Sequence, residues 1–466
     1  MDNPVGRRSF RWQVLSFTLL AFGLRFYRLG FHSLWMDEAL TVHDAGHPFR
    51  EIPNVILASP PLFHFIIRIF YLVFGRSDFW LRVPSAFFGT LTVPLIILVA
   101  RRFYGERAAF WAGALMTVSV FDVFFSQEVR MYSLVALEAL VSMVLWTEAM
   151  DTRQPKLWIL YGLVSLLGLF THNWFPLLVL AQGGWWLIQN LKNRRMDGPG
   201  FCAFLGVTIL YGPWLLMVKR QLANPCYSWL TVPDWKMARE TLYSYAGIRV
   251  FSGDSWLGVG TDARLPFLVL SSGFLIWGLV FRDEKRALAI RTFLVGCLLP
   301  VGTAFLVSVF IRPIYMPGRY PILGLPAYLL TVARGFQGVP VRYRRAAVCL
   351  GILWIGVSLY LIGRYYWFYE KSPWKRTCQW ILRQTSASDP LYLNVQAANS
   401  TFPIEYYLAS RRVVEIPVPD QGRDKPIYSI LEKTGEEQFP MAAPSRRAVA
   451  EAAHFGRLTV YKTRKS

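Results

Sequence analysis

The sequence predicts an all-α polytopic membrane protein with a small extracytoplasmic α/β or α+β domain at its C-terminal end. Three observations indicate this class. Of the 466 residues, 54% are hydrophobic and only 17% are charged, whereas soluble domains carry about 25% charged residues. Long apolar runs recur along the chain, and about eleven of them approach the roughly 18 residues that a transmembrane helix needs. The basic residues gather in every second connection between these runs.

The predicted spans form one module over residues 1–366. They cover residues 12–29, 81–100, 108–125, 131–149, 157–171, 174–191, 200–218, 264–281, 292–311, 320–336 and 346–366. Two connections in this module are long, a first loop at residues 30–80 and a later loop at residues 219–263.

The charge distribution orients the module. Lysine and arginine number 50 against 29 acidic residues, a net charge of +21, which in a soluble protein would suggest a nucleic-acid partner. Here the excess lies in connections such as the one with Arg101, Arg102 and Arg107, and the positive-inside rule makes these connections cytoplasmic. The expected partner of the excess charge is therefore the lipid bilayer and not nucleic acid. Both long loops then face outward, and we expect a protein of the bacterial inner or plasma membrane.

One apolar stretch, Pro60 to Gly75, does not fit this alternation. Counting it as a span would place the basic cluster after the next span on the outer side. The stretch is short, and His64 and Arg68 lie four residues apart on one helical face. We interpret it as a juxtamembrane or re-entrant helix on the outer side.

The tail, residues 367–466, differs in composition from the membrane module. Charged residues, Ser, Thr and Pro are scattered through short apolar runs such as Pro390 to Val395 and Arg411 to Ile416. These runs predict strands, and a helix is expected near Trp374 to Arg383. The tail is thus predicted to be a small domain on the extracytoplasmic side.

The chain has five cysteines. Cys202, Cys297 and Cys349 lie in predicted spans, where they are expected to pack as small apolar residues. Cys226 and Cys378 both fall outside the spans and could pair, although their spacing predicts nothing about the geometry.

Two adjacent carboxylates, Asp37 and Glu38, follow the first span in the stretch Ser33-Leu34-Trp35-Met36-Asp37-Glu38-Ala39. Such a pair at a membrane surface repels itself and is costly to desolvate, so it requires a cation, a donor or a substrate nearby. One of the two can act as a general base. The alternative is an ordinary polar loop.

Further polar motifs fall on the same outer side. They are Ser59-Pro60-Pro61-Leu62-Phe63, Leu81-Arg82-Val83-Pro84-Ser85-Ala86 and Ser126-Gln127-Glu128-Val129-Arg130-Met131-Tyr132. The guanidinium of Arg82 or Arg130 can bind a phosphate through its rigid fork of donors. Gln127 and Glu128 can hold sugar hydroxyls or orient Arg130. The alternative for Glu128 and Arg130 is an end-of-helix pair of little consequence.

These motifs, in their order, spacing and shared sidedness, resemble the GT-C superfamily of membrane glycosyltransferases. The likeness is to the family 39 protein mannosyltransferases and the bacterial aminoarabinose-transferase-like enzymes. It is clearest over residues 20–190 and includes Pro317-Gly318-Arg319-Tyr320-Pro321, which looks like the family's Pro-x-Arg-Tyr element. Ser59 stands before Pro60 where the protein mannosyltransferases typically have a histidine, and the lumenal repeat domain of the eukaryotic enzymes is absent. Both departures make protein O-mannosylation less expected.

The resemblance implies a polyprenyl-phosphate-linked sugar as donor and a glycan, lipid or protein as acceptor. Carried over by position, Asp37 is the candidate base and Glu38 its partner. The residues implied to line the pocket are Gln127, Glu128, Arg130 and Tyr132.

Three more residues are candidates for substrate binding, beside Arg82. Arg319 and Tyr320 lie in a short outer link, where Arg319 is a second phosphate candidate; the alternative is an interfacial anchor. His172 lies between two spans on the outer side, where it could contact a sugar or a phosphate or be structural.

No metal site is assigned and no cofactor is expected to be required. A divalent cation bound by His43, Asp44 and His47 together with Asp37 or Glu38 is a weaker alternative, because a loop His-x-x-x-His has little specificity.

The sequence therefore predicts an inverting glycosyltransferase acting on the extracytoplasmic face. The alternative is a transporter or flippase of a lipid-linked saccharide, for which Glu138 in the fourth span is the best argument, since intramembrane carboxylates often mark ion pathways. A third alternative is that this chain is a family member that has lost catalysis and only binds glycolipid. A transporter would concentrate polar residues near the midplane on broken, repeated helices, whereas this chain concentrates them in outer loops.

Overall fold

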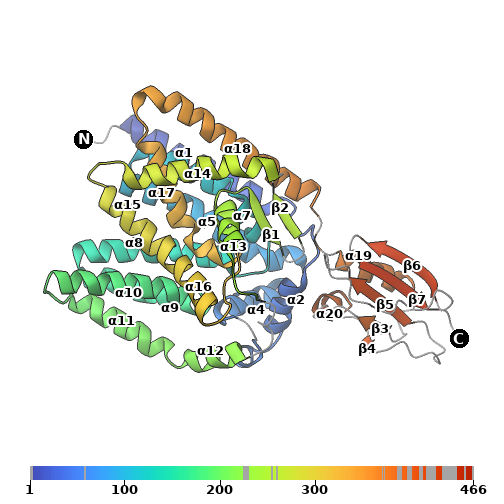
Figure 1. Cartoon of the computed structure of the whole chain (residues 1–466). Coiled ribbons are helices and arrows are strands. Elements are labelled where there is room, and N and C mark those ends of the chain that lie inside the picture. The colour runs from blue at the N-terminus through green and yellow to red at the C-terminus, as the bar shows by residue number, and fades with distance from the viewer. Residues whose placement is uncertain are drawn as a thin grey trace.

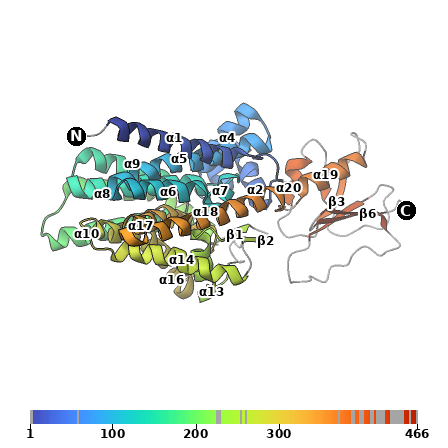
Figure 2. The same cartoon turned by 90° about the horizontal axis from the view of Figure 1, so that it is seen from above.

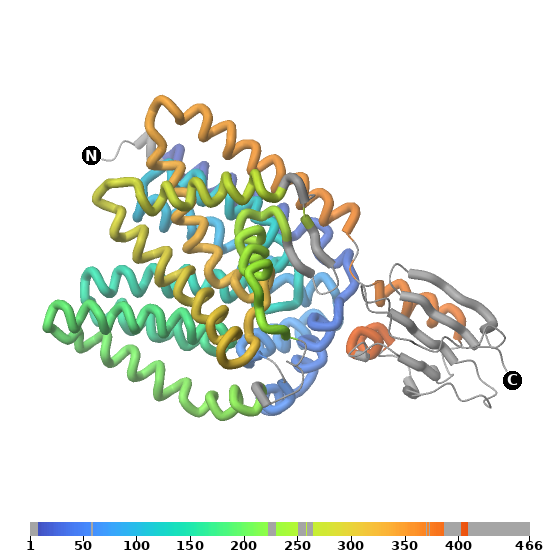
Figure 3. The backbone as a smooth tube through the Cα atoms, in the orientation of Figure 1, coloured from blue at the N-terminus to red at the C-terminus, as the bar shows by residue number. Residues whose placement is uncertain are grey.

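In the computed structural model, most of the chain is described, with short gaps that are commonest after residue 369. The described residues are 4–56, 59–223, 230–252, 255–258, 261–369, 371, 373–385, 391–395, 401–408, 413–415, 427–432, 449–455 and 458–463. The helices lie side by side in one bundle, and α19 and α20 lie at one end of it (Figure 1; Figure 3).

The first half of the chain supplies the helices α1 (Pro4–Phe26), α2 (Met36–Ala45), α3 (Ile52–Val55), α4 (Leu62–Phe74), α5 (Asp78–Tyr104), α6 (Glu106–Thr117), α7 (Val120–Ser126), α8 (Tyr132–Thr152), α9 (Pro155–Thr171), α10 (Phe175–Lys192), α11 (Gly198–Tyr211) and α12 (Trp214–Ala223). The second half supplies α13 (Trp235–Tyr245), α14 (Thr261–Val280), α15 (Arg286–Phe293), α16 (Leu299–Phe310), α17 (Leu325–Gln337), α18 (Arg344–Trp367), α19 (Trp374–Arg383) and α20 (Thr401–Tyr407). A π-helical turn, Leu294–Leu298, joins α15 to α16, and 3-10 turns cover Tyr320–Gly324 and Val341–Tyr343.

Several of these helices can cross a membrane. Among the described residues, four segments are long and apolar enough: Asp78–Tyr104, Tyr132–Thr152, Arg286–Phe310 and Val341–Trp367. Two bent pairs raise the number to six if each pair is one span, and Leu62–Phe74, Pro155–Thr171 and Arg264–Val280 are shorter apolar helices. The predicted polytopic helical class agrees with this arrangement, while the number of eleven spans stays a prediction.

The predicted span at residues 108–125 is broken. It forms α6 and α7, which meet at 51°. The first helix ends at Thr117, and Ser119 caps the second, since its hydroxyl accepts a hydrogen bond from the backbone NH of Asp122. The break frees the carbonyls of Met116 and Thr117, and the guanidinium of Arg25 donates to both. The same guanidinium pairs with the buried carboxylate of Asp122 at 2.6 Å, so a cation and an anion stabilise the break.

The predicted span at residues 200–218 is also bent. Its two parts, α11 and α12, meet at 56° at Gly212 and Pro213. Proline lacks a backbone NH and its ring collides with the preceding turn, which is the usual cause of a sharp helix bend.

Small residues allow the helices of the bundle to pack closely. A Cβ added at Gly335 on α17 would lie 2.0 Å from the carbonyl oxygen of Phe274 on α14, and one added at Gly278 on α14 would lie 2.1 Å from that of Thr331 on α17. The two backbones are therefore in direct contact, as membrane helices with small residues at their interfaces allow.

The tail contains a mixed sheet of five strands: β3 (Leu391–Val395), β4 (Val413–Glu415), β5 (Ile427–Glu432), β6 (Val449–Phe455) and β7 (Leu458–Thr463). The strand order is β4-β3-β5-β7-β6. Strands β4, β3 and β5 pair in parallel, whereas β7 pairs antiparallel with both β5 and β6. Helix α19 has the bounds that the sequence predicts, and β3 and β4 lie inside the predicted strands. The domain boundary at residue 366 and the outer location of the tail stay predictions.

A second, two-stranded sheet lies in the later long loop. It pairs β1 (Arg249–Ser252) with β2 (Ser255–Gly258) in antiparallel fashion. Cys226 of this loop lies outside the described residues, so its pairing with Cys378 stays a prediction.

Candidate functional site

The two adjacent carboxylates lie in the first turn of α2. The carboxylate of Glu38 accepts a hydrogen bond from the backbone NH of Trp35 at 3.3 Å, which caps the helix. A helix N-terminus favours negative charge in its first turn. The local sequence therefore places Asp37 and Glu38 side by side but turns them to different neighbours.

Glu38 is fully buried and bound to a buried arginine on α5. The guanidinium of Arg82 donates to both carboxylate oxygens, at 2.8 and 3.0 Å. It also donates to the carbonyls of Leu29, His32 and Ser33. An arginine has five NH donors, and these five hydrogen bonds use all of them. Arg82 thus holds the loop between α1 and α2 against α5, and no donor is left for a phosphate.

A lysine that follows α18 completes this cluster. The ammonium of Lys371 lies 3.3 Å from Glu38 and 2.9 Å from Glu128, and all three side chains are buried. The backbone NH of Val129 donates to Glu38 at 2.9 Å. Segments near residues 38, 128 and 371 therefore meet at one point.

The cluster has a clear electrostatic pattern. Burial alone would raise the pKa of Glu38, but the positive charges of Arg82 and Lys371 lower it to about 2. Burial raises the pKa of Glu128 above its usual value, Lys371 opposes this shift and the charge of Glu38 adds to it. Glu38 is therefore an anion at neutral pH, and Lys371 favours the ionised form of Glu128.

Asp37 lies at the rim of the cluster. Its side chain is 18% exposed, and its Oδ2 accepts from Arg319 at 3.2 Å. Arg319 lies over the ring of Trp35, 4.8 Å from the ring centre. The residue before it, Gly318, has a φ of 73°, a left-handed conformation that glycine adopts without strain. The turn at Gly318 thus lets Arg319 reach α2 from the segment before α17.

Arg130 is the second cation beside Asp37. Its guanidinium donates to the backbone carbonyl of Asp37 at 3.2 Å and to the hydroxyl of Thr41 at 2.9 Å. Its Nε is buried and has no hydrogen-bond partner among the described residues. The hydroxyl of Ser85 donates to the Arg130 carbonyl and fixes the backbone there.

Aromatic side chains form one side of the site. Tyr320 lies 5.4 Å from the ring of His172 and 6.5 Å from that of Tyr132, measured between ring centres. Burial and, to a lesser degree, the charge of Arg130 lower the pKa of His172 to about 3. The ring is therefore neutral at physiological pH, and its Nδ1 accepts from the backbone NH of Trp174 at 3.0 Å.

Gln127 is used inside the protein. Its amide nitrogen donates to the carbonyls of Arg25 at 3.0 Å and Tyr27 at 2.8 Å, at the end of α1. The side chain holds α1 against the segment between α7 and α8.

The structure brings together most of the residues that the sequence singled out. Asp37, Glu38, Glu128, Arg130 and Arg319 lie in one network with two parts, a buried ion cluster and a rim. Tyr132, His172 and Tyr320 lie next to it, whereas Arg82 and Gln127 hold the backbone. The roles of these residues toward a substrate stay predictions.

Lys371 was missed by the sequence reasoning. It lies 333 residues from Glu38 along the chain, in a polar stretch without any periodic pattern. A lysine immediately after the last span, in a tail predicted to face outward, was the available signal.

The histidines considered as metal ligands lie at the other end of α2. His43 contacts Asp44 at 3.3 Å, and His64 of α4 lies 3.8 Å from the same carboxylate. The ring of His47 faces the carbonyls of His43 and Asp44. Within the described ranges, no group of three His, Cys, Asp or Glu side chains is arranged to hold a metal ion.

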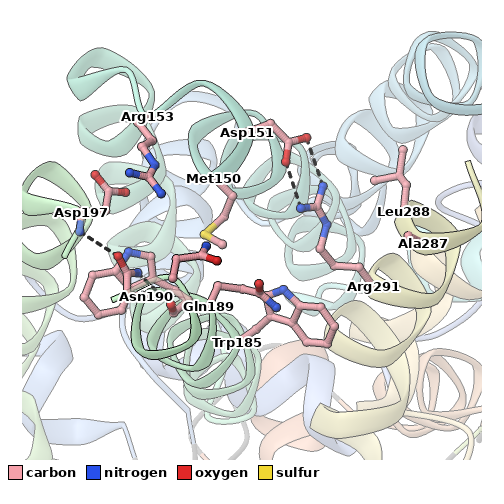
Figure 4. Close-up of a pocket in the computed structure, with 12 residues that line it drawn as sticks. Met150, Asp151, Arg153, Trp185, Gln189, Asn190, Asp197, Ala287, Leu288 and Arg291 are labelled. Atoms are coloured by element: carbon pink, nitrogen blue, oxygen red, sulfur yellow. Dashed lines mark hydrogen bonds and ion pairs between the residues drawn. The ribbon is translucent and has the colours of Figure 1, made fainter. Parts of the chain in front are cut away.

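A pocket of about 350 Å³ lies far from this network, at the opposite end of α8 (Figure 4). Since α8 has 21 residues, the two ends are roughly 30 Å apart. Arg291 closes one side by a bidentate pair with Asp151 at 3.0 and 3.1 Å. The pocket therefore belongs to the end of the bundle that the basic connections predict to be cytoplasmic.

Comparisons with known proteins agree with the resemblance seen in the sequence. Residues 58–218 match the family model described as dolichyl-phosphate-mannose-protein mannosyltransferase. An uncharacterized protein of Aquifex aeolicus (strain VF5) is 23% identical over 329 residues, which are 65% of this chain and 60% of the relative. The match thus spans about three fifths of that relative's length.

Solved structures share the fold over almost the whole chain. ArnT from Cupriavidus metallidurans in the apo state superposes with a TM-score of 0.59 at 14% identity, over 98% of each chain. ArnT bound to undecaprenyl phosphate gives 0.56 at 13% identity, over 100% of this chain and 99% of ArnT. The oligosaccharyltransferase AglB from Archaeoglobus fulgidus, in complex with an inhibitory peptide and a dolichol-phosphate, gives 0.53 at 12% identity, over 92% of this chain and 70% of AglB.

These findings confirm the resemblance to the GT-C glycosyltransferases. The chain has the fold of that superfamily, and its apolar helices identify it as an integral membrane protein.

Proposed function

We propose that this chain, with its GT-C fold, is an inverting glycosyltransferase that moves a sugar from a polyprenyl-phosphate donor to an acceptor on the extracytoplasmic face. The family match supports glycosyl transfer. The lipid phosphates named for ArnT and AglB support a lipid-linked donor here. The expected acceptor is a glycan, a lipid or a protein.

The observation that carries this proposal is the setting of Asp37. Glu38 and Glu128 are fully buried and bound to cations, whereas Asp37 is partly exposed. A general base must reach the proton it removes. Asp37 is therefore the carboxylate of the network that an acceptor arriving from water can meet.

In the proposed reaction, Asp37 takes the proton of the acceptor hydroxyl. The hydroxyl oxygen attacks the anomeric carbon from the face opposite the phosphate, and a new glycosidic bond forms. The bond between the anomeric carbon and the phosphate oxygen breaks, and polyprenyl phosphate leaves with both electrons. A single displacement of this kind inverts the anomeric configuration.

The leaving phosphate needs positive charge near the membrane surface. Arg130 and Arg319 both lie beside Asp37. Arg319 donates to the Asp37 carboxylate and so orients the base. The Arg130 Nε has no partner among the described residues, and we assign the phosphate to Arg130. With two guanidinium groups in place, the proposed reaction requires no metal ion, and chelation by EDTA should leave the rate unchanged.

The test begins with the missing product. Mass spectrometry of surface glycans and lipids from a deletion strain identifies the sugar and the acceptor. Purified protein in nanodiscs is then given the polyprenyl-phosphate-linked form of that sugar, and NMR follows the anomeric configuration of the product. Inverted product supports the proposal, whereas retention would refute the single displacement and absence of transfer would refute the activity.

One observation favours transport as a second candidate. Glu138 is buried within α8, where its Oε1 accepts from Thr171 at 2.9 Å and its Oε2 has no hydrogen-bond partner among the described residues. A flippase in proteoliposomes would move a lipid-linked saccharide, lose this activity in Glu138→Gln and keep it in Asp37→Asn. A glycosyltransferase would instead lose sugar transfer in Asp37→Asn and keep it in Glu138→Gln.

A further inference from the structure

We propose that Lys371 is a positioning residue of this site, which the C-terminal part of the chain supplies to set the placement of Asp37 and Arg130. The inference rests on the proposed function for its catalytic consequence. The placement itself rests on contacts within the protein.

The first argument is charge. Glu38 and Glu128 are both fully buried, and two buried carboxylates in contact with one group cannot both stay ionised without cations. Arg82 neutralises Glu38 through two hydrogen bonds. Among the described residues, Lys371 is the cation that forms an ion pair with Glu128. Removing it leaves Glu128 as a buried carboxylate without a counterion.

The second argument is connectivity. Glu38 is the neighbour of Asp37 on α2, and Glu128 lies two residues before Arg130. By contacting both carboxylates, Lys371 joins the helix that carries the proposed base to the segment that carries the proposed phosphate ligand. A shift of about 1 Å between such groups can cost about 10²-fold in rate.

The third argument is the way in which Lys371 is held. Just after it, Lys375 on α19 pairs with Asp78 at 3.0 Å, and its backbone NH donates to the Ser33 hydroxyl. The Tyr407 hydroxyl of α20 accepts from the Leu34 backbone NH at 2.7 Å and donates to Asp78 at 3.2 Å. Figure 2 shows α20 beside α2 at this end of the bundle. The tail thus docks on the first outer loop and holds Lys371 in the cluster.

The cluster also predicts a pH effect. The charged groups that face Glu128 are Lys371, Glu38 and Arg319. His32 is neutral, because burial and then the charges of Lys371 and Arg82 lower its pKa to about 3. Loss of Lys371 therefore raises the pKa of both carboxylates. Protonation then begins at higher pH, and the acid limb of the activity profile moves to higher pH.

The experiment uses the full-length protein in nanodiscs with four variants: Lys371→Met, Lys371→Arg, Glu128→Gln and the double variant Lys371→Met/Glu128→Gln. Arg383→Met is the matched control. It removes an exposed cation from α19, the helix that follows Lys371, at a position that the three arguments do not use. Thermal unfolding midpoints are measured for all of them, followed by kcat, the donor KM and the pH profile of transfer.

We expect Lys371→Met to lower the unfolding midpoint and the double variant to recover most of that loss. We expect Lys371→Met to lower kcat by up to about 10²-fold with little change in donor KM. We also expect it to move the acid limb of the pH profile to higher pH. Lys371→Arg should restore much of kcat, and Arg383→Met should stay within about twofold of the parent.

The proposal would be overturned if the midpoint losses of Lys371→Met and Glu128→Gln simply added in the double variant. A parental kcat together with a parental pH profile in Lys371→Met would also overturn it. If the parent itself transfers no sugar, the proposed function fails. The unfolding measurements still decide whether Lys371 is the counterion that holds the two carboxylates together.

Discussion

Two neighbouring carboxylates at the start of α2 have opposite surroundings. Glu38 points inward to Arg82 and Lys371 and is fully buried. Asp37 points to the rim, where Arg319 contacts it. One residue along a helix is a rotation of about 100°, so adjacent side chains can take a structural role and a chemical role.

The first prediction concerns the base. Asp37→Asn keeps the size and removes the proton acceptor, so sugar transfer should fall by ~10² or more while donor binding persists. Glu51→Gln, an exposed carboxylate change in the same loop, should leave transfer near the parental rate. Parental turnover in Asp37→Asn would exclude Asp37 as the base.

The second prediction separates the two arginines. Arg130→Lys keeps the charge but loses the planar fork, so transfer should fall clearly, and Arg130→Ala should also weaken binding of the donor lipid. Arg319→Lys should lower kcat with less effect on donor binding, because Arg319 orients Asp37. Equal losses of donor binding in Arg130→Ala and Arg319→Ala would show that both hold the phosphate.

The third prediction is a pH dependence of stability. The pKa of Glu38 lies at about 2 in the folded protein, below its ordinary value of 4.5. The depressed pKa stabilises the fold fully above about pH 4.5, and this stabilisation is lost as the pH falls through 2. Glu38→Gln leaves the buried guanidinium of Arg82 without its anion, while Lys371 keeps its pair with Glu128, and should cost about 3–5 kcal/mol at pH 7. Unfolding of parent and variant between pH 7 and pH 3 should show the difference shrinking toward acid.

The residues of the rim were easier to predict than the cluster behind them. Asp37, Arg130 and Arg319 stand in short motifs on one side of a predicted topology, and the structure brings them together. Arg82 and Gln127 were assigned to substrate because a free side chain and one bonded to backbone carbonyls look the same in a sequence. Lys371 could not be placed, since its partners depend on how the tail folds back.

At the scale of elements, hydrophobic runs predicted where most helices lie but not where they break. The apolar run at residues 108–125 is interrupted by Thr117, Ser119 and Asp122, but these residues alone do not predict that α6 ends at Thr117. The break depends on Arg25, which comes from another helix and satisfies the freed carbonyls. In contrast, the bend between α11 and α12 has a local signal in Gly212 and Pro213.

The fourth prediction tests the break between α6 and α7. Arg25→Met leaves Asp122 buried without its cation and should destabilise the protein by about 3–5 kcal/mol. Arg11→Met, at an exposed position of the same helix, should change the unfolding midpoint little. The double variant Arg25→Met/Asp122→Asn should recover part of the loss in thermal unfolding. Equal unfolding midpoints for Arg25→Met and Arg11→Met would contradict a structural role for the pair of Arg25 and Asp122.

At the scale of the whole molecule, the two ends of the bundle differ in what they contain. The ion cluster and Asp37 lie at one end of α8, and the basic connections with the pocket near Arg291 lie at the other. Hydropathy and basic residues predicted this polarity, whereas the docking of α19 and α20 on α2 required the folded chain.

The fifth prediction is the membrane topology. A reporter fused at Asn193 should be cytoplasmic, and one fused at Ser386 should be on the outer side, because the basic connections are retained inside. The matched measurement is labelling of both fusions in intact and permeabilised cells. Two reporters on the same side would remove the common outer face that the proposed reaction needs.

The partner of Arg25 also constrains how the protein is made. Asp122 follows Arg25 by 97 residues, so at about 5–20 residues per second the ribosome needs roughly 5–20 s to deliver it. During that interval the guanidinium on α1 has no counterion and stays with water or lipid headgroups. We therefore expect the first helix to reach its final depth only after the third predicted span has been synthesised, so that an early helix waits for a later one during insertion.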